Sequence, residues 1–273
     1  VPVQILQAVA YAETQWQMID GDEEFDGWEP ASGAMALRGA NITRAAELLG
    51  LDVDAVEQSR QANIRAAAAL LSDLADDQQI DRAGLGAWAP AIAELADIAD
   101  HNASIGYIHN DVFGLIKNGL VVTDLAGNVI SEIEPEPDVT PNYDPPGGPT
   151  FATMPDDVGA IYRNSPNQGT RPAGATGKVR MVITHTCEGA YSACWGWLDN
   201  SQSGVSAHYV VKEDGSEITQ LVKEADKAGH IAAKYKNSLN GGKYAEFEGS
   251  SSNNFTIGIE HADSFVAVGG FDD

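Results

Sequence analysis

Residues 179–186 read Val179-Arg180-Met181-Val182-Ile183-Thr184-His185-Thr186. The branched and apolar side chains at the start of this stretch predict a β-strand. Because side chains alternate between the two faces of a strand, His185 shares a face with Met181 and Ile183. An imidazole held on a rigid element where the sheet meets solvent is a good metal ligand. A strand-end histidine is more often an ordinary solvated group, so this stretch predicts the element before it predicts a function.

The residues that follow predict a mixed α/β domain over 158–273. Two β-strand patterns, 208–211 and 217–222, flank Asp214-Gly215, which is a strong hairpin signal. Residues 193–198 fit the start of a helix.

A further strand over 255–260 ends at Glu260, and Gly258 leaves open space beside that carboxylate. If this strand lies next to 179–183, His185 and Glu260 converge at one edge of the sheet. That is the arrangement that metal-assisted hydrolysis needs, because the metal lowers the pKa of a water and a carboxylate takes the proton.

The first part of the chain predicts an all-α unit over residues 1–120. Apolar residues recur at helical spacing, with no strand-like alternation, in five stretches. These stretches are 5–16, 42–50, 63–71, 88–99 and 107–120. Residues 121–157 hold eight acidic and no basic side chains, and seven prolines lie between positions 135 and 155. Proline stiffness and charge repulsion predict an extended linker there.

The charge balance limits the partners of this chain. Forty acidic against 16 basic residues give a formal charge of −24. A field this negative repels phosphate backbones, so we expect no nucleic acid partner. A salty habitat, solubility outside the cell and attraction to a cationic surface all remain open as reasons for it. No apolar run approaches the roughly 20 residues that a membrane-spanning helix needs.

The two cysteines, Cys187 and Cys194, are seven positions apart. This spacing favours a local disulfide that closes a loop, which implies an oxidising compartment. A pair of buried thiols is the alternative.

Five motifs in sequence order carry a resemblance to a known family. They are Val182-Ile183-Thr184-His185-Thr186, Val205-Ser206-Ala207-His208-Tyr209-Val210-Val211, Asp214-Gly215 with residues 218–222, Asp226-Lys227-Ala228-Gly229-His230, and Asn253-Asn254-Phe255-Thr256-Ile257-Gly258-Ile259-Glu260. Over residues 178–261 the order and spacing resemble the N-acetylmuramoyl-L-alanine amidases, which are zinc enzymes, and the related peptidoglycan recognition proteins.

The resemblance implies a role for each matching residue. His185 matches the first zinc ligand, and Glu260 matches the general base that activates the zinc-bound water. His230, Ser206 and Asn254 correspond to the substrate-binding groove, whereas His208 corresponds to a structural histidine. Gly229 stands where the family has a tryptophan, so a stacking surface is not implied here.

The family's two further zinc ligands, a His and then an Asp or Cys, have no counterpart before Asp273. His261 follows Glu260 and points to the other face of the sheet, so we do not assign it as a ligand. Because the chain also begins without Met, we expect a fragment cut at both ends. The alternative is a domain that binds glycan without cutting it.

A second candidate is Glu13, on the apolar side of the first predicted helix. Partial burial would raise its pKa, which suits a general acid, although a boundary Glu on an amphipathic helix is the more common case. Residues 5–16, Ser32-Gly33-Ala34-Met35-Ala36-Leu37 and residues 63–71 resemble a lytic-transglycosylase or lysozyme-like domain. Ala36 stands where that family has a polar group, which favours a wall-binding or degraded module over an active glycosidase.

The sequence therefore predicts an α+β protein of two domains: an all-α lysozyme-like domain over 1–120, a linker over 121–157, and an α/β amidase domain with a mixed central sheet over 158–273. The resemblance implies zinc-dependent cleavage between N-acetylmuramic acid and L-alanine in peptidoglycan, outside the cytoplasm in the cell wall or periplasm. The alternatives are a non-catalytic peptidoglycan-binding module and glycan-strand cleavage by the N-terminal domain.

Overall fold

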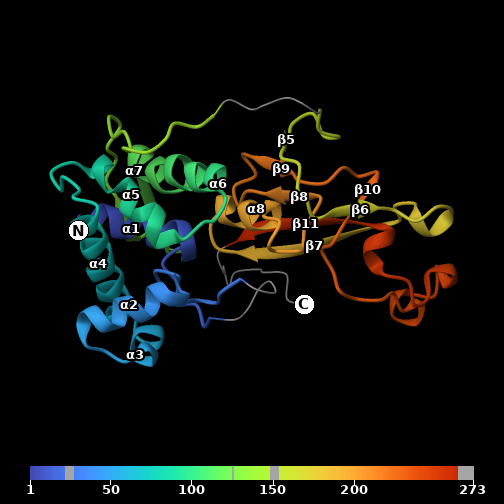
Figure 1. Ribbon diagram of the computed structural model, residues 1–273, viewed down its shortest axis with the longest axis horizontal. Coiled ribbons are helices and arrows are strands. Elements are labelled where there is room, and N and C mark those ends of the chain that lie inside the picture. The colour runs from blue at the N-terminus through green and yellow to red at the C-terminus, as the bar shows by residue number, and fades with distance from the viewer. Residues whose placement is uncertain (22–27, 125, 148–153, 264–273) are drawn as a thin grey trace. The chain divides into compact units, whose positions relative to one another are not determined.

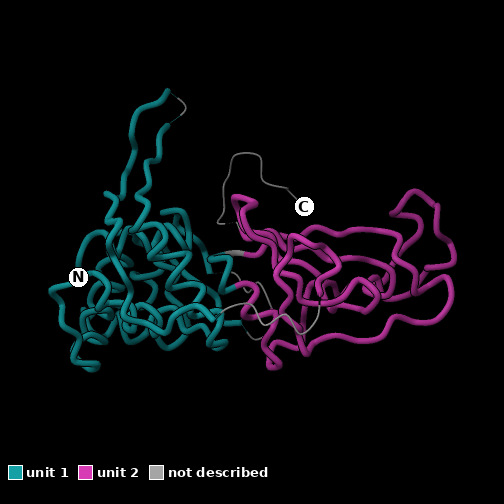
Figure 2. Tube along the Cα trace, turned by 90° about the horizontal axis from the view of Figure 1, so that it is seen from above, with its two compact units in different colours: residues 1–147, 188–193, 263–273 teal, residues 148–187, 194–262 magenta. Residues whose placement is uncertain are grey.

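A computed structural model describes residues 1–21, 28–124, 126–147 and 154–263. The chain divides into two compact units, coloured separately in Figure 2. The helical unit comprises residues 1–147, 188–193 and 263–273, and the sheet unit comprises 148–187 and 194–262. Part of the expected linker, 148–153, lies outside the described residues.

Helices dominate the first unit, as the apolar spacing predicted. Its helices are α1 (Val3–Thr14), α2 (Gly39–Leu49), α3 (Val53–Gln58), α4 (Arg60–Asp77), the 3-10 turn η1 (Leu85–Trp88), α5 (Ala89–Ala96), α6 (His101–Gly106), the π-helical η2 (Tyr107–Val112) and α7 (Phe113–Asn118). The last three follow one another without a break, so the stretch predicted over 107–120 is the second half of a longer helical run.

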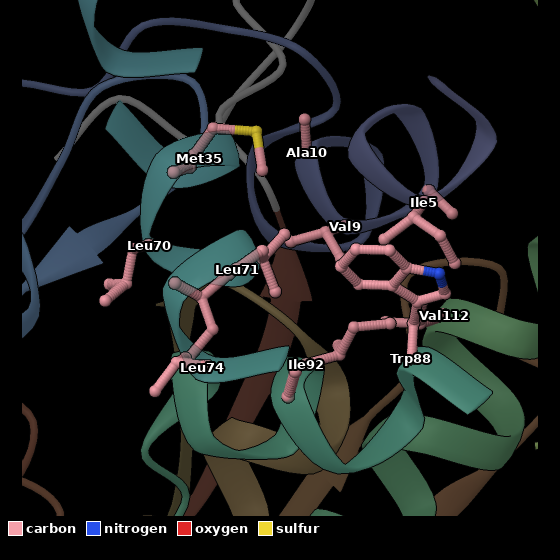
Figure 3. Close-up of a cluster of buried hydrophobic side chains, with 14 of the residues drawn as sticks. Ile5, Val9, Ala10, Met35, Leu70, Leu71, Leu74, Trp88, Ile92 and Val112 are labelled. Carbon is pink, nitrogen blue, oxygen red and sulfur yellow. The ribbon is translucent and has the colours of Figure 1, made fainter. Parts of the chain in front are cut away.

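One apolar core holds these helices together (Figure 3). Helix α1 contributes Ile5 and Val9, which are spaced by one turn, and α4 contributes side chains from the same face over several turns. Trp88 is almost fully buried among them. Burial of such side chains is the main favourable contribution to folding.

The prediction that this unit contains no strands was wrong in detail. A short hairpin, β1 (Ala31–Ser32) with β2 (Leu37–Arg38), follows α1, and a second, β3 (Leu120–Thr123) with β4 (Val129–Ile133), follows α7. The strands of the first hairpin have only two residues each, and the sequences of the second, Leu-Val-Val-Thr and Val-Ile-Ser-Glu-Ile, do not alternate apolar with polar residues. The second hairpin occupies residues that the sequence analysis assigned to the linker.

A buried asparagine shapes the turn of the first hairpin. Asn63, on α4, is fully buried; its Oδ1 accepts the backbone N–H of Met35 at 2.8 Å, and its Nδ2 donates to the carbonyl of Ser32 at 3.0 Å. Gly33, between them, has φ of +77°, and a Cβ there would lie 2.1 Å from Asn63 Nδ2. The Gly-x-Met segment named above is therefore fixed by α4.

The sheet unit contains the predicted mixed sheet, which has five strands in the order β5-β9-β8-β11-β7 (Figure 1). This strand order was not predicted. Its strands are β5 (Ile161–Tyr162), β7 (Met181–Glu188), β8 (Tyr209–Val211), β9 (Ile218–Gln220) and β11 (Thr256–Asp263). Strands β8 and β9 are the antiparallel hairpin expected around Asp214-Gly215, whereas β11 runs parallel to β8. The strands that carry His185 and Glu260 are neighbours.

Smaller elements surround this sheet. They are β6 (Gln168–Thr170) paired with β10 (Asp226–Ala228), helix α8 (Tyr191–Asp199), and the 3-10 turns η3 (Ala175–Gly177), η4 (Asn237–Asn240), η5 (Ala245–Phe247) and η6 (Ser252–Asn254).

Trp195, on α8, is a buried core residue, and the guanidinium of Arg163 lies 3.8 Å from its ring centre. Cys187 and Cys194 form the expected disulfide. None of the described helices is both long and apolar enough to cross a bilayer.

We predict that Asn63→Ala destabilises the helical unit by about 2–3 kcal/mol, because two buried backbone groups lose their partners. Urea unfolding followed by far-ultraviolet circular dichroism, which reports mainly on the helices, measures the change. Asn102→Ala, at an exposed helical position, is the matched control and should leave the free energy of unfolding within about 0.5 kcal/mol of the parent value. Equal effects of the two changes would contradict the role of Asn63.

Candidate functional site

His185 lies on β7, the edge strand of the five-stranded sheet, and its side chain is half-buried. Glu260 lies on the neighbouring strand β11 and is 2% exposed. Within β11, Glu260 shares a face with Gly258 and Thr256, because strand side chains alternate. His185 reaches this same face, as its contact with His230 shows.

The imidazoles of His185 and His230 meet edge to face. His185 Nε2 lies 3.0 Å from His230 Nδ1, and the ring centres are 5.3 Å apart. On the other side of its ring, His230 Nε2 lies 2.8 Å from the hydroxyl of Thr256. The sequence analysis placed His230 in the substrate groove and did not anticipate its contact with His185.

The His230 ring lies directly against the backbone of Gly258. A Cβ at this position would come within 2.3 Å of His230 Cγ, closer than real side chains approach. Any residue with a side chain here must displace the ring. Gly258 therefore provides the space in which His230 reaches His185, rather than only open space beside Glu260.

His208 is a buried structural histidine, as the resemblance implied. Its Nδ1 accepts the backbone N–H of Gly258 at 3.0 Å, and its Nε2 lies 3.2 Å from the carbonyl of Asp226. Burial lowers the pKa of His208 to about 4, and burial together with the neighbouring His185, His208 and Arg171 lowers the pKa of His230 to about 3. Both rings are neutral at physiological pH.

Arg171 joins the beginning of β11 to the segment before β10. Its guanidinium donates to a set of backbone carbonyls at 2.8–3.2 Å, and one of its nitrogens lies 2.9 Å from His208 Nε2. The carbonyls belong to Glu224, Asn253, Asn254 and Thr256. The sequence analysis missed Arg171, because nothing in its local pattern marks an arginine whose partners are main-chain atoms.

Glu260 is the buried acid of this site. Desolvation raises its pKa to about 8, and its Oε2 has no hydrogen-bond partner among the described residues. A buried oxygen without a partner is costly, which is typical of a group whose partner is a substrate, water or ion. This is the environment expected for a carboxylate that exchanges a proton.

Two of the residues assigned to the substrate groove have other surroundings. Ser206 is fully buried; its hydroxyl donates to the carbonyl of Asn167 at 2.5 Å and accepts the N–H of Gly229 at 3.1 Å. We therefore assign Ser206 to the scaffold. Asn254 ends η6, and its carbonyl is held by Arg171.

The neighbouring Asn253 holds the backbone at His230, a role that the sequence analysis did not predict. Its side-chain oxygen accepts the backbone N–H groups of His230 and Ile231 at 3.2 and 3.1 Å.

Glu13 occupies the interior of the helical unit. It is 6% exposed; burial raises its pKa, against the opposing effects of the Arg38 charge and a hydrogen bond from Tyr107. The hydroxyl oxygen of its neighbour Thr14 lies 2.8 Å from the carbonyl of Ala10 and 2.8 Å from that of Ala34, so its single proton is shared between α1 and the turn of the first hairpin. The raised pKa agrees with the prediction for a general acid.

The described residues fit zinc only in part. His185 is an imidazole of the expected kind on a strand, and Glu260, on the same face of the sheet, has one oxygen without a hydrogen-bond partner among the described residues. No group of three or more His, Cys, Asp or Glu that could hold a metal ion occurs among the described residues. Structural and catalytic zinc sites use three or four protein ligands, so this part of the chain supplies less than a full set.

Comparison with protein families identifies one region. Residues 175–272 match the family model described as N-acetylmuramoyl-L-alanine amidase. This amidase-like region holds His185, His208, His230 and Glu260. The amidase resemblance is thereby supported for the sheet unit, and the lysozyme-like resemblance of the helical unit stays a prediction.

Individual relatives agree with the family match. N-acetylmuramoyl-L-alanine amidase A of Achromobacter lyticus is 31% identical over 97 residues, which are 36% of this chain and 45% of that protein. The chain therefore spans less than half the length of this relative. A solved structure described as a selenomethionine AmpD derivative is similar at 21% identity and a TM-score of 0.30, over 39% of this chain and 62% of that one.

We predict that Gly258→Ala separates His230 from His185, since the new Cβ occupies the position of the ring. The expected cost is about 1–3 kcal/mol of stability, the usual result of overpacking. Nitrogen-15 spectra of the histidine rings should show His185 and His230 shifted and His208 less affected. Gly84→Ala, at an exposed position with φ of −115° where a Cβ meets nothing within 4 Å, controls for loss of glycine. Unchanged ring signals in Gly258→Ala would refute this account.

We also predict that Glu260 makes stability fall as pH rises. The unfolded chain releases this proton near pH 4.5, whereas the folded protein retains it to about pH 8. Between these values the folded state holds more protons, so stability decreases with pH, by at most about 1.4 kcal/mol per pH unit. Urea unfolding across this range should show a shallower slope for Glu260→Gln, whereas exposed Glu246→Gln should keep the parent slope. Identical slopes in all three proteins would contradict a raised pKa.

Proposed function

We propose that the amidase-like region hydrolyses the amide bond between N-acetylmuramic acid and the L-alanine of the peptidoglycan stem peptide. The observation that carries this proposal is the meeting of His185 and His230 on the face of the sheet that also holds buried Glu260. The family match over residues 175–272 supplies the reaction class.

The proposed roles follow from the properties of each residue. His185 would hold zinc as one ligand of a larger set. Zinc, when bound, supplies positive charge that polarises the amide carbonyl and acidifies water. Glu260 accepts the proton of the attacking water and returns it to the departing amine of L-alanine. His208 and Arg171 keep the strands in register and take no part in proton transfer.

The raised pKa of Glu260 has a consequence for this role. At neutral pH the carboxyl group is largely protonated in the protein without a cation, because its burial is not offset by a nearby positive charge. A cation close to a carboxylate favours its ionised form. Glu260 therefore acts as a base only when a cation is bound nearby. Without the cation, its protonated form does not accept a proton.

The helical unit offers a second candidate function, cleavage or binding of the glycan strand. Its buried Glu13, with a raised pKa, favours a general acid.

The Cys187–Cys194 disulfide supports a location outside the cytoplasm, where the cell wall is found and where disulfides persist.

We predict that His185→Ala and Glu260→Gln abolish release of stem peptides from purified sacculi, with a loss of at least about 100-fold. Mass spectrometry of the digested sacculi reports the products, since amidase action creates new L-alanine amino termini. His261→Ala, on the opposite face of β11, is the matched control and should retain activity.

The same digest separates the alternatives. New sugar ends that disappear in Glu13→Gln would assign the activity to the helical unit. Binding to sacculi without any product would indicate a recognition module. Stem-peptide release that survives His185→Ala would overturn the proposed site.

A further inference from the structure

We infer that His230 is a positioning residue: a hydrogen-bond chain of fixed direction, running from His185 through His230 and Thr256 to the carbonyl of Ser252, places the proton of His185 on Nε2 and leaves Nδ1 as the nitrogen that would hold the metal. This inference rests on the proposed function for the identity of the metal ligand. The chain itself is a property of the metal-free protein.

The direction of the chain is fixed at its far end. The hydroxyl of Thr256 lies 2.9 Å from the carbonyl oxygen of Ser252, which can only accept. The single hydroxyl proton of Thr256 is therefore committed to Ser252. Because Thr256 is fully buried, its oxygen has no bulk water to exchange this partner for.

The next two links follow from the first. Thr256 Oγ1 can only accept from His230, so His230 carries its proton on Nε2, 2.8 Å away. A neutral imidazole has one donor and one acceptor nitrogen, which leaves His230 Nδ1 as an acceptor. His185 Nε2, 3.0 Å from that atom, must then be the donor. With its proton on Nε2, His185 carries its lone pair on Nδ1.

Other contacts hold His230 in this orientation. Asn253 fixes the main chain at residues 230 and 231, and the backbone of Gly258 closes the face of the ring. The ring therefore cannot turn over without losing the Thr256 bond. A rigid partner of this kind is what a metal-binding histidine needs, because the hydrogen bond on one ring nitrogen selects the other as ligand.

The assignment changes the role of His230 from the one the resemblance implied. A residue of the substrate groove would alter substrate affinity, whereas a positioning residue alters the affinity for the metal before any substrate is present. Direct coordination by both rings is the competing arrangement, and it would place the ion between the two nitrogens that now share a proton.

The test is a long-range nitrogen-15 correlation spectrum of the metal-free chain labelled on its six histidines, at neutral pH. Single His→Gln variants assign the signals. We expect both His185 and His230 to carry the proton on Nε2. Thr256→Val should mix the tautomers of both rings, Thr256→Ser should restore them, and Thr219→Val, a buried threonine on β9, should change neither.

Zinc titration against a chromophoric chelator gives the second measurement. His230→Ala should lower the affinity for Zn²⁺ about 10- to 100-fold, as loss of an outer partner does, and less than His185→Ala. Three results would overturn the inference: a proton on His230 Nδ1, tautomers indifferent to Thr256→Val, or equal zinc losses in His230→Ala and His185→Ala. None of these depends on hydrolysis, so a failed amidase assay with the expected tautomers would reject the proposed function alone.

Discussion

The close approach of the His230 ring to the backbone of Gly258 is the constraint on which the rest of the site depends. Strand β11 lies between β8 and β7, so its residue 258 is surrounded by main chain on both sides. Only a residue without a side chain leaves space there for an imidazole. The ring then spans from the hydroxyl of Thr256 to His185, on a different strand. The absence of a Cβ at Gly258 therefore allows His230, in a loop, to contact His185 on the edge strand β7.

The scaffold satisfies its buried polar groups with main-chain partners. Arg171 serves four carbonyls, His208 accepts the N–H of Gly258, and Asn253 binds two successive N–H groups. Such bonds do not depend on the rotamer of a second side chain, so they define the backbone positions closely. Glu260 differs from these three residues, because its buried Oε2 has no hydrogen-bond partner among the described residues; in the same unit, the same holds for Trp195 Nε1 and the hydroxyl of Tyr235. Glu260 lies on the face of the sheet that also holds His230, so a ligand of that site can complete its oxygen.

The sequence predicted the helices and strands better than it predicted the contacts between side chains. Alternation and the Asp214-Gly215 signal identified the strands around His185 and Glu260, since half-buried strands bear a clear period. The hairpins of the helical unit escaped because β1 and β2 have two residues each and the sequences of β3 and β4 do not alternate apolar with polar residues. Strand position already indicated Glu260, and the resemblance added His230, but neither predicted the contact of His230 with His185. That contact joins residues 45 positions apart, through a loop whose path is set by Asn253 and Gly258. Local periodicity carries no information about such a path, nor about Arg171 and Thr256, which look like ordinary polar residues.

Glu13 and Glu260 both have raised pKa values, but their ionised forms have different support from neighbouring groups. Desolvation is the first cause of the raised pKa at both Glu13 and Glu260. Glu13 is partly compensated by the charge of Arg38 and by the hydroxyl of Tyr107, so its ionised form already has support inside the helical unit. Glu260 has no such compensation, and desolvation alone determines its shift. A carboxyl group in this state responds strongly to a cation, because nothing else screens the new charge. Under the proposed function, a bound cation would therefore shift the ionisation of Glu260 more than that of Glu13.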